Sequence, residues 1–114
     1  RDIEAELITE LSKSKNTVIA CGGGTPCFGN NMSVMNDSGY TVYLELNENE
    51  LFTRLNNEKD NRPLITDLNE DKLKAYIQKT LSKRMPFYLQ AQEVINANIK
   101  NVPEITEDIL RLLP

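Results

Sequence analysis

Hydrophobic residues recur along the first half of the chain in patterns that alternate between helix and strand. In residues 1–14 the apolar positions lie three or four apart, which predicts an amphipathic helix. Residues 17–21 (TVIAC) form an unbroken apolar run, typical of a strand buried on both faces of a parallel sheet. Residues 30–39 predict a short helix that ends at Gly39. Residues 40–46 (YTVYLEL) are rich in β-branched and aromatic side chains and predict a second strand.

The next segment begins with a helix and continues into a long polar stretch. Asn47 is predicted to cap a helix over residues 47–55, because an asparagine side chain can accept a hydrogen bond from the first helical turn. Residues 56–71 (NNEKDNRPLITDLNED) predict a polar loop with Pro63 in its middle.

The last third of the chain repeats the alternation of helix and strand. Apolar residues at helical spacing predict a helix from residue 71 to about residue 92, which Pro86 should kink or interrupt. Residues 93–98 (EVINAN) predict a third strand, and a final helix is expected to start with Pro103 at its first position. Helices that alternate with apolar strands predict an α/β domain with a parallel sheet.

Composition limits the classes of function that remain open. A chain of 114 residues, 39% hydrophobic and 26% charged, fits one small domain with a modest core. It has no apolar stretch long enough to span a membrane and its first residues do not resemble a secretory signal, so we expect a cytoplasmic protein. The net charge of -4 and a pI near 4.8 argue against nucleic acid as a partner, because phosphate backbones are bound by clustered cations.

The chain contains no histidine, which removes the commonest general base and the commonest zinc ligand. Its chemistry must therefore use carboxylates, arginines, backbone amides or a bound cofactor. Two cysteines, Cys21 and Cys27, cannot form a zinc site alone, and we expect them to stay reduced as small packing residues.

Three consecutive glycines, Gly22–Gly24, directly follow the apolar run of residues 17–21. Ligands of open α/β sheets bind beyond the carboxyl ends of the strands, where this run would end. Glycines there let the backbone approach a ligand closely and leave N–H groups free to donate to an anion. A tight turn without a ligand is the alternative. The run is not a P-loop, since no Lys-Ser or Lys-Thr follows it.

Arginines in turns are the second candidate for binding chemistry. Guanidinium groups recognise carboxylates and phosphates through paired N–H donors. Arg62 precedes Pro63, Arg84 lies two residues before Pro86, and Arg1 stands ahead of Glu4. Each arginine alone could equally be a solvated surface residue.

Taken together, five short segments resemble the successive signatures of the shikimate kinase family. The segments are Arg1-Asp-Ile-Glu4, VIACGGG at 18–24, VYL at 42–44, RPLI at 62–65 and KRMPFY at 83–88. They occur in the family's order with family-like spacing, and the match extends from residue 1 to about Pro103. The resemblance implies a P-loop kinase-like α/β fold of the nucleoside monophosphate kinase type, with a parallel sheet flanked by helices.

The resemblance also implies how the acceptor would be bound. In the family, the arginine of an R-x-x-E signature and the arginine before x-Pro-x-Tyr hold the shikimate carboxylate, which implies Arg1 and Arg84 here. Glu4 would orient these arginines, and Gly23 would contact a substrate hydroxyl. The neighbouring glycines that would shape this turn are Gly22 and Gly24.

On the nucleotide side, the resemblance implies a mobile lid over about residues 56–69. Arg62 corresponds to the lid arginine that reaches toward the ATP phosphates and would stabilise the transition state of phosphoryl transfer. Arg54 and the turn at Val102 and Pro103 correspond approximately to positions that flank adenine in the family.

One family signature is absent from these residues. Shikimate kinases open with a strand and a Gly-x-x-x-x-Gly-Lys-Ser/Thr loop, followed by an aspartate segment that serves Mg²⁺, and neither occurs here. Residues 1–114 are therefore expected to be the C-terminal part of a single domain that is incomplete here, with no metal ligand of their own. We expect this part alone to fold poorly and to be inactive, and the full-length protein to be monomeric.

The resemblance implies an ATP-dependent kinase that transfers the terminal phosphoryl group to the 3-hydroxyl of shikimate, with Mg²⁺ as cofactor, in aromatic amino-acid synthesis. Three alternatives stay open. They are a related sugar-acid kinase such as gluconate kinase, a non-catalytic shikimate-binding module, and a structural domain whose glycines only form a turn.

Overall fold

Helices and strands alternate along the chain, which a computed structural model describes from Arg1 to Pro114. The elements are α1 (Asp2–Leu11), the 3-10 helix η1 (Thr25–Cys27), α2 (Asn31–Ser38), β1 (Val42–Glu45), α3 (Glu48–Glu58), the 3-10 helix η2 (Lys59–Asn61), α4 (Glu70–Tyr88), β2 (Glu93–Asn96) and α5 (Val102–Leu112). None of the helices is both long enough and apolar enough to cross a membrane.

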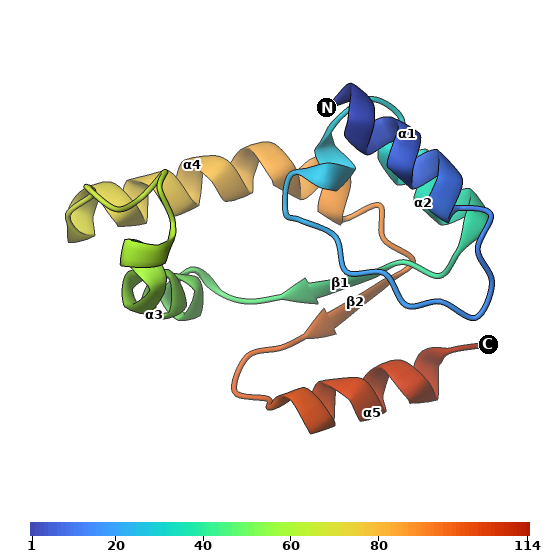
Figure 1. Cartoon of the computed structure of the whole chain (residues 1–114). Helices are drawn as coiled ribbons and strands as arrows, with labels where there is room; N and C mark the ends of the chain where they lie inside the picture. Colours follow the sequence, from blue (N-terminus) through green and yellow to red (C-terminus); the bar gives the residue numbers. More distant parts are fainter.

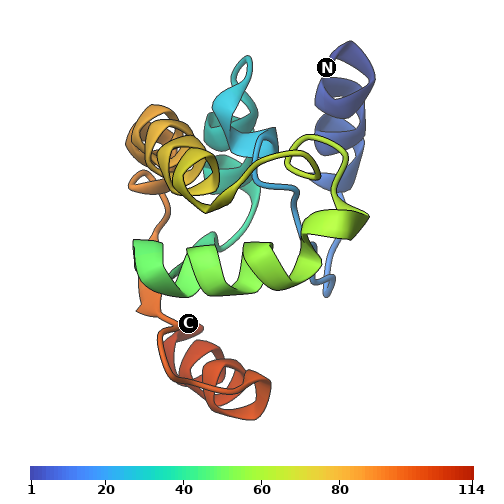
Figure 2. The ribbon, with the colours of Figure 1, turned by 90° about the vertical axis from the view of Figure 1, so that its left-hand side faces the viewer.

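The sheet consists of two parallel strands that are far apart in the sequence. β1 pairs with β2 in a register that places Val42 opposite Glu93 and Glu45 opposite Asn96. In Figure 1, α5 runs along one side of the strand pair, and α1, α2 and α4 lie on the other side; Figure 2 shows the same separation after a quarter turn. The predicted α/β class with a parallel sheet is confirmed.

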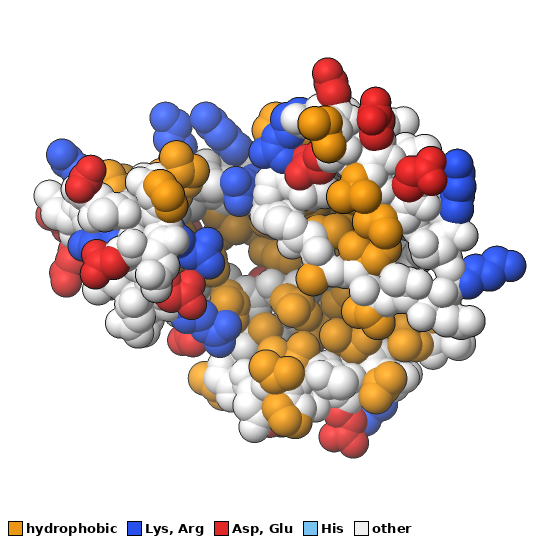
Figure 3. All heavy atoms as spheres, viewed as in Figure 1, with side chains coloured by type: hydrophobic (Ala, Val, Ile, Leu, Met, Phe, Trp, Pro, Cys, Tyr) orange, Lys and Arg blue, Asp and Glu red, His pale blue; other side chains and the backbone are white.

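The predicted strand over residues 17–21 is wrong. These residues form no ladder with another strand, and Val18 is 99% exposed. The reason is physical: a strand exists only through hydrogen bonds to a neighbouring strand, and the sheet contains only β1 and β2, which pair with each other and not with this segment. Apolar side chains therefore remain uncovered in the middle of the molecule, as Figure 3 shows around the strand pair and between α1 and α5.

The polar segment 56–71 is more ordered than predicted. α3 continues to Glu58 and the short helix η2 follows, so the segment begins inside helical structure. Ile65 is only 3% exposed and forms a small core with Leu73 and Ile77 of α4. Leu68 of the same segment packs against this core, and burying these apolar side chains helps to hold the segment on α4 because it removes hydrocarbon from water.

Asparagine side chains set the starts of the later helices. Asn47 accepts a hydrogen bond from the N–H of Glu50 at 2.8 Å, which confirms it as the cap of α3. Asn101 forms a reciprocal capping box with Glu104, a signal in the sequence N-x-x-E that the prediction from Pro103 missed.

The two proline positions and the end of α4 differ slightly from prediction. Pro103 occupies the second position of α5, after Val102, rather than the first. α4 contains Pro86 and ends two residues later at Tyr88, so it stops short of residue 92. Pro86 has no N–H to donate to the carbonyl four residues earlier, which weakens the last turn, and the chain leaves the helix there toward β2.

Replacing Leu73 with alanine is expected to lower the free energy of unfolding by about 3 kcal/mol. Leu73 is the most completely buried large side chain, with 0% exposure, and its loss would leave a cavity between Ile65 and Ile77. Urea denaturation followed by circular dichroism measures the change. Lys79→Ala, an exposed change on the same helix, is the control. A loss equal to that of the control would contradict the prediction.

Candidate functional site

The glycine turn presents backbone donors that the protein itself does not use. The N–H of Thr25 donates to the carbonyl of Gly22, and the N–H of Cys27 donates to that of Gly24. These bonds fold the three glycines into the start of η1. The N–H groups of residues 22–24 donate to no acceptor in the protein, and such a run of free N–H groups can donate hydrogen bonds to an oxygen-rich ligand.

Guanidinium groups lie directly against two of the three glycines. A Cβ atom at Gly23 would lie 2.7 Å from Nη1 of Arg84, and one at Gly24 would lie 2.7 Å from Nη2 of Arg1. At Gly22 the nearest atom would be the hydroxyl of Thr25, at an ordinary 3.6 Å. Side chains at positions 23 and 24 would therefore push the arginines away from the turn.

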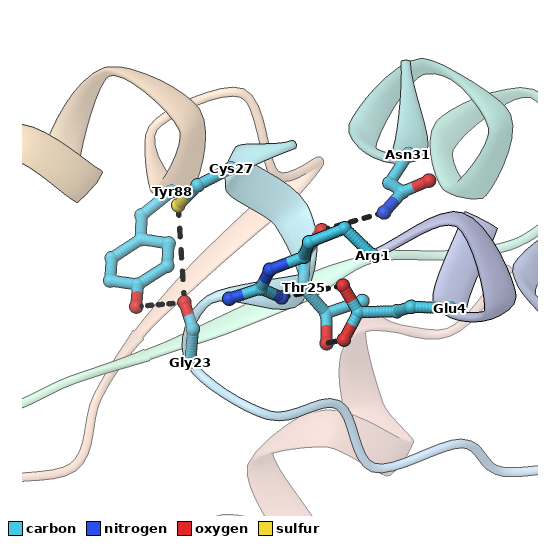
Figure 4. Close-up of polar contacts among 7 residues, drawn as sticks. All are labelled: Arg1, Glu4, Gly23, Thr25, Cys27, Asn31 and Tyr88. Atoms are coloured by element: carbon cyan, nitrogen blue, oxygen red, sulfur yellow. Dashed lines mark hydrogen bonds and ion pairs between the residues drawn. The ribbon is translucent and has the colours of Figure 1, made fainter. Parts of the chain in front are cut away.

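Arg1 is held on its edge by a carboxylate and on its face by an aromatic ring. Its Nη1 atom forms an ion pair with Oε1 of Glu4 at 2.6 Å, and Oε2 of Glu4 accepts a hydrogen bond from the Thr25 hydroxyl at 2.9 Å. Its guanidinium carbon lies 3.7 Å from the centre of the Phe28 ring, a cation–π contact. Figure 4 shows Arg1 and Glu4 side by side next to the turn.

Arg84 lies on the other side of the turn and has no partner of opposite charge. It is half-buried on α4. None of the structure's ion pairs or side-chain hydrogen bonds includes it; the ion pairs join Arg1–Glu4, Lys13–Glu10, Arg54–Glu50, Arg62–Glu58, Lys100–Asp108 and Arg111–Glu107. A guanidinium that is half-buried without a partner offers its full set of donors to a carboxylate or phosphate. The positively charged side chains of Arg1 and Arg84 thus lie on opposite sides of the glycine turn.

Tyr88, which sequence reasoning left without a role, anchors the turn. Its hydroxyl donates a hydrogen bond to the carbonyl of Gly23, and its ring packs against Tyr43 with the centroids 5.0 Å apart. In Figure 4 the Tyr88 hydroxyl and the Cys27 thiol both point at this carbonyl. The motif that contains Arg84 also supplies Tyr88 one helical turn later, so this spacing could have indicated the anchor.

The structure does not bring the predicted nucleotide-side residues to the glycine turn. Arg62 follows η2, where it pairs with Glu58 at 3.1 Å, and Figure 1 places this segment at the opposite end of α4 from the turn. Arg54 pairs with Glu50 on α3, which packs on α4, whereas Val102 and Pro103 begin α5 beside β2. The structure thus assembles the predicted acceptor site and leaves the nucleotide-side residues apart.

The two cysteines are free thiols, as expected. Cys21 is exposed and its sulfur lies 3.7 Å from that of Met35, so any packing role that it has is at the surface and not in the core. Desolvation raises the pKa of both the Cys21 and the Cys27 thiol. The thiolate is the nucleophilic form, so neither is set up as a nucleophile.

The hydrogen-bond partners of Glu4 lower the pKa of its carboxyl group. The hydrogen bond from Arg1, and after it the one from Thr25, holds the pKa of the Glu4 carboxyl below its ordinary value of 4.5. A lowered pKa in the folded state means that the ionised carboxylate stabilises the fold above pH 4.5, and that this contribution is lost as the pH falls through the folded pKa.

Replacing Arg1 with methionine is expected to raise the pKa of Glu4 toward its ordinary value, because the largest stabiliser of the carboxylate is removed. The carboxyl carbon shift of Glu4, followed by NMR between pH 2 and 7, measures this change. Lys13→Met, on a surface pair with Glu10, is the control and should leave the Glu4 titration where it was. An unchanged titration in Arg1→Met would contradict the prediction.

A parallel β pair flanked by helices, with a glycine turn between two arginines, defines an α/β domain whose glycine turn suits an anionic ligand. A family model described as shikimate kinase matches residues 1–114, and the chain therefore belongs to the shikimate kinase family.

Individual relatives agree with the family match. The shikimate kinase of Bacteroides thetaiotaomicron is 42% identical over 98 residues, which are 86% of this chain and 56% of the relative. That of Parabacteroides distasonis is 36% identical over 99% of this chain and 68% of its own length. A 1.7 Å crystal structure of shikimate kinase from Bacteroides thetaiotaomicron superposes with a TM-score of 0.86 at 38% identity, covering 97% of this chain and 64% of that one. The chain thus spans little more than half to two thirds of these relatives.

Proposed function

We propose that the whole protein is a shikimate kinase, which transfers the terminal phosphoryl group of ATP to the 3-hydroxyl of shikimate. The observation that carries this proposal is the pair of arginines, Arg1 and Arg84, placed against consecutive glycines. A carboxylate between two guanidiniums, beside free backbone N–H donors, suits a small polyhydroxylated acid. Membership of the shikimate kinase family supports the same acceptor.

In this proposal the acceptor's two kinds of polar group bind at different parts of the site. Arg1 and Arg84 bind the carboxylate, and Glu4 orients Arg1 through their ion pair. The N–H of Gly23 binds a ring hydroxyl, since the carbonyl of Gly23 is already engaged by Tyr88. The turn that presents this N–H is shaped by the flanking glycines, Gly22 and Gly24.

On the donor side, residues 56–69 act as a lid whose Arg62 reaches the phosphates of ATP. The ion pair of Arg62 with Glu58 is exposed, with both side chains 55% accessible, so little free energy holds the arginine in its present position. Arg54, Val102 and Pro103 are proposed to flank the adenine ring.

We propose that Mg²⁺ binds together with ATP and not to residues of this chain alone. No three acidic, cysteine or histidine side chains of these 114 residues lie together as a metal site, so no residue here is assigned to the ion. We further propose that the residues are the C-terminal part of one kinase domain, and that the protein works as a monomer in the cytoplasm, where ATP is available.

A coupled assay of ADP release by the whole protein tests the function, with Mg²⁺, ATP and either shikimate, gluconate or no acceptor. The proposal expects release that depends on shikimate and is near background with gluconate. Release that depends on gluconate instead would contradict the acceptor, and shikimate binding without any ADP release would contradict the kinase activity.

A further inference from the structure

We propose that Thr25 is a positioning residue that sets the orientation of Arg1 through Glu4, with Asn31 holding Thr25 in place. The inference rests on the proposed function, because the orientation of Arg1 matters for an acceptor carboxylate. It adds two residues to the acceptor site that neither touch the acceptor nor belong to the signatures on which the family resemblance depends.

Both oxygens of the Glu4 carboxylate accept hydrogen bonds, and the two donors come from different parts of the chain. Oε1 accepts from Arg1 at 2.6 Å within α1, and Oε2 accepts from the hydroxyl of Thr25 at 2.9 Å, from the first position of η1. A carboxylate with one partner can turn about its last side-chain bond, whereas a second partner at the other oxygen fixes its plane. The plane of Glu4 in turn fixes where the Arg1 guanidinium points.

Two hydrogen bonds of the Thr25 backbone hold this residue in place. Nδ2 of Asn31 donates to the Thr25 carbonyl at 2.9 Å, and the N–H of Thr25 donates to Gly22. Thr25 and Asn31 are 7% and 2% exposed and are the only buried polar residues of the chain. Buried polar groups are costly unless they are paired, and every buried side-chain polar atom here has its partner.

Phe28 and Gly24 also contact the Arg1 guanidinium. The Phe28 ring, at the end of η1, covers one face of the guanidinium at 3.7 Å, and the backbone of Gly24 lies against Nη2. Glu4 engages only Nη1, so donors of Arg1 remain available on the side of the turn. Thr25 therefore connects the glycine turn to the arginine that works beside it, as Figure 4 shows.

The experiment compares variants of the whole protein by calorimetric titration with shikimate. Thr25→Val removes the hydroxyl but keeps the shape, and it is expected to raise the dissociation constant for shikimate about five- to tenfold, the scale of one ordinary hydrogen bond. The affinity for ATP should not change. Thr25→Ser retains the donor and should stay within about twofold of the unaltered protein.

Thr9→Val is the matched control, because it removes an exposed hydroxyl of α1 that bonds only to the backbone of its own helix. Thermal denaturation verifies that each variant folds. If Thr25→Val does not fold, Thr25→Ala replaces it, since it removes the hydroxyl without placing a methyl group against Glu4.

A second background separates action through Glu4 from a general effect on the fold. In Glu4→Ala, the Thr25→Val change should have no further effect on shikimate binding, because the group that Thr25 positions is gone. An equal effect of Thr25→Val in both backgrounds, or no effect in the unaltered one, would overturn the inference alone. If the unaltered protein bound no shikimate, the proposed function would fall and the inference with it.

Discussion

Replacing Arg84 with alanine is expected to raise the dissociation constant for shikimate by roughly 30- to 5000-fold, the equivalent of about 2 to 5 kcal/mol. Arg84 is half-buried and has no acidic partner in the protein, so its donors are available to the ligand. Its removal would leave the acceptor carboxylate with Arg1 alone. Calorimetric titration of the whole protein measures the change, and the affinity for ATP serves as an internal reference.

The matched control is Arg111→Ala, which removes an exposed arginine on α5. It should leave shikimate affinity unaltered, while Arg84→Lys should recover only part of the loss, because an ammonium lacks the paired donors of a guanidinium. Equal affinities for Arg84→Ala and Arg111→Ala would mean that Arg84 is a solvated surface residue and that the glycines form only a turn.

The second large effect is expected at Arg62. Arg62→Ala should lower kcat about a thousandfold, because an arginine that reaches the transferring phosphoryl group stabilises charge in the transition state. Shikimate affinity should stay nearly constant, since Arg62 follows η2, and this segment lies at the far end of α4 from the glycine turn. A rapid-quench measurement of a single turnover isolates the chemical step from product release.

Glu58→Gln gives a control at the same place in the structure. It breaks the only ion pair of Arg62 and leaves the arginine free, so kcat should be unchanged or higher. A loss of kcat in Glu58→Gln as large as in Arg62→Ala would instead indicate that the pair is needed only for the local structure. An undiminished kcat in Arg62→Ala would remove Arg62 from the chemistry.

Local signals in the sequence predicted the elements whose causes are local. The helical spacing of residues 2–11 and the cap at Asn47 depend on neighbours within four positions, and both were confirmed. The parallel pairing of β1 with β2 also followed from the alternation of helix and strand, because strands joined by helices run in the same direction.

Features that depend on distant partners could not be predicted in the same way. Residues 17–21 have the composition of a buried strand, yet composition does not supply the neighbouring strand that would pair with them. Ile65 sits in a polar stretch, and only the packing of α4 made it a core residue.

The residues of the candidate site also differ in whether a local sequence motif identifies them. The glycines, Arg1 and Arg84 were recognisable because each belongs to a short motif, and the structure places them together. Thr25 and Asn31 act through contacts that belong to no short motif, so no pattern in the sequence marks them. Tyr88 is marked by its spacing from Arg84, but its bond to the carbonyl of Gly23 joins residues 65 positions apart and is seen only in the structure.

Helix α4 connects the proposed lid to the proposed acceptor site. Its first turns pack on Ile65 of the proposed lid, and its last residue, Tyr88, is bonded to the glycine turn. Nineteen helical residues make a stiff rod about 28 Å long. A tilt of about 10° at the Tyr88 end would carry the other end through about 5 Å. A small movement of Tyr88 at the proposed acceptor site would therefore be transmitted by α4 as a larger displacement of the proposed lid.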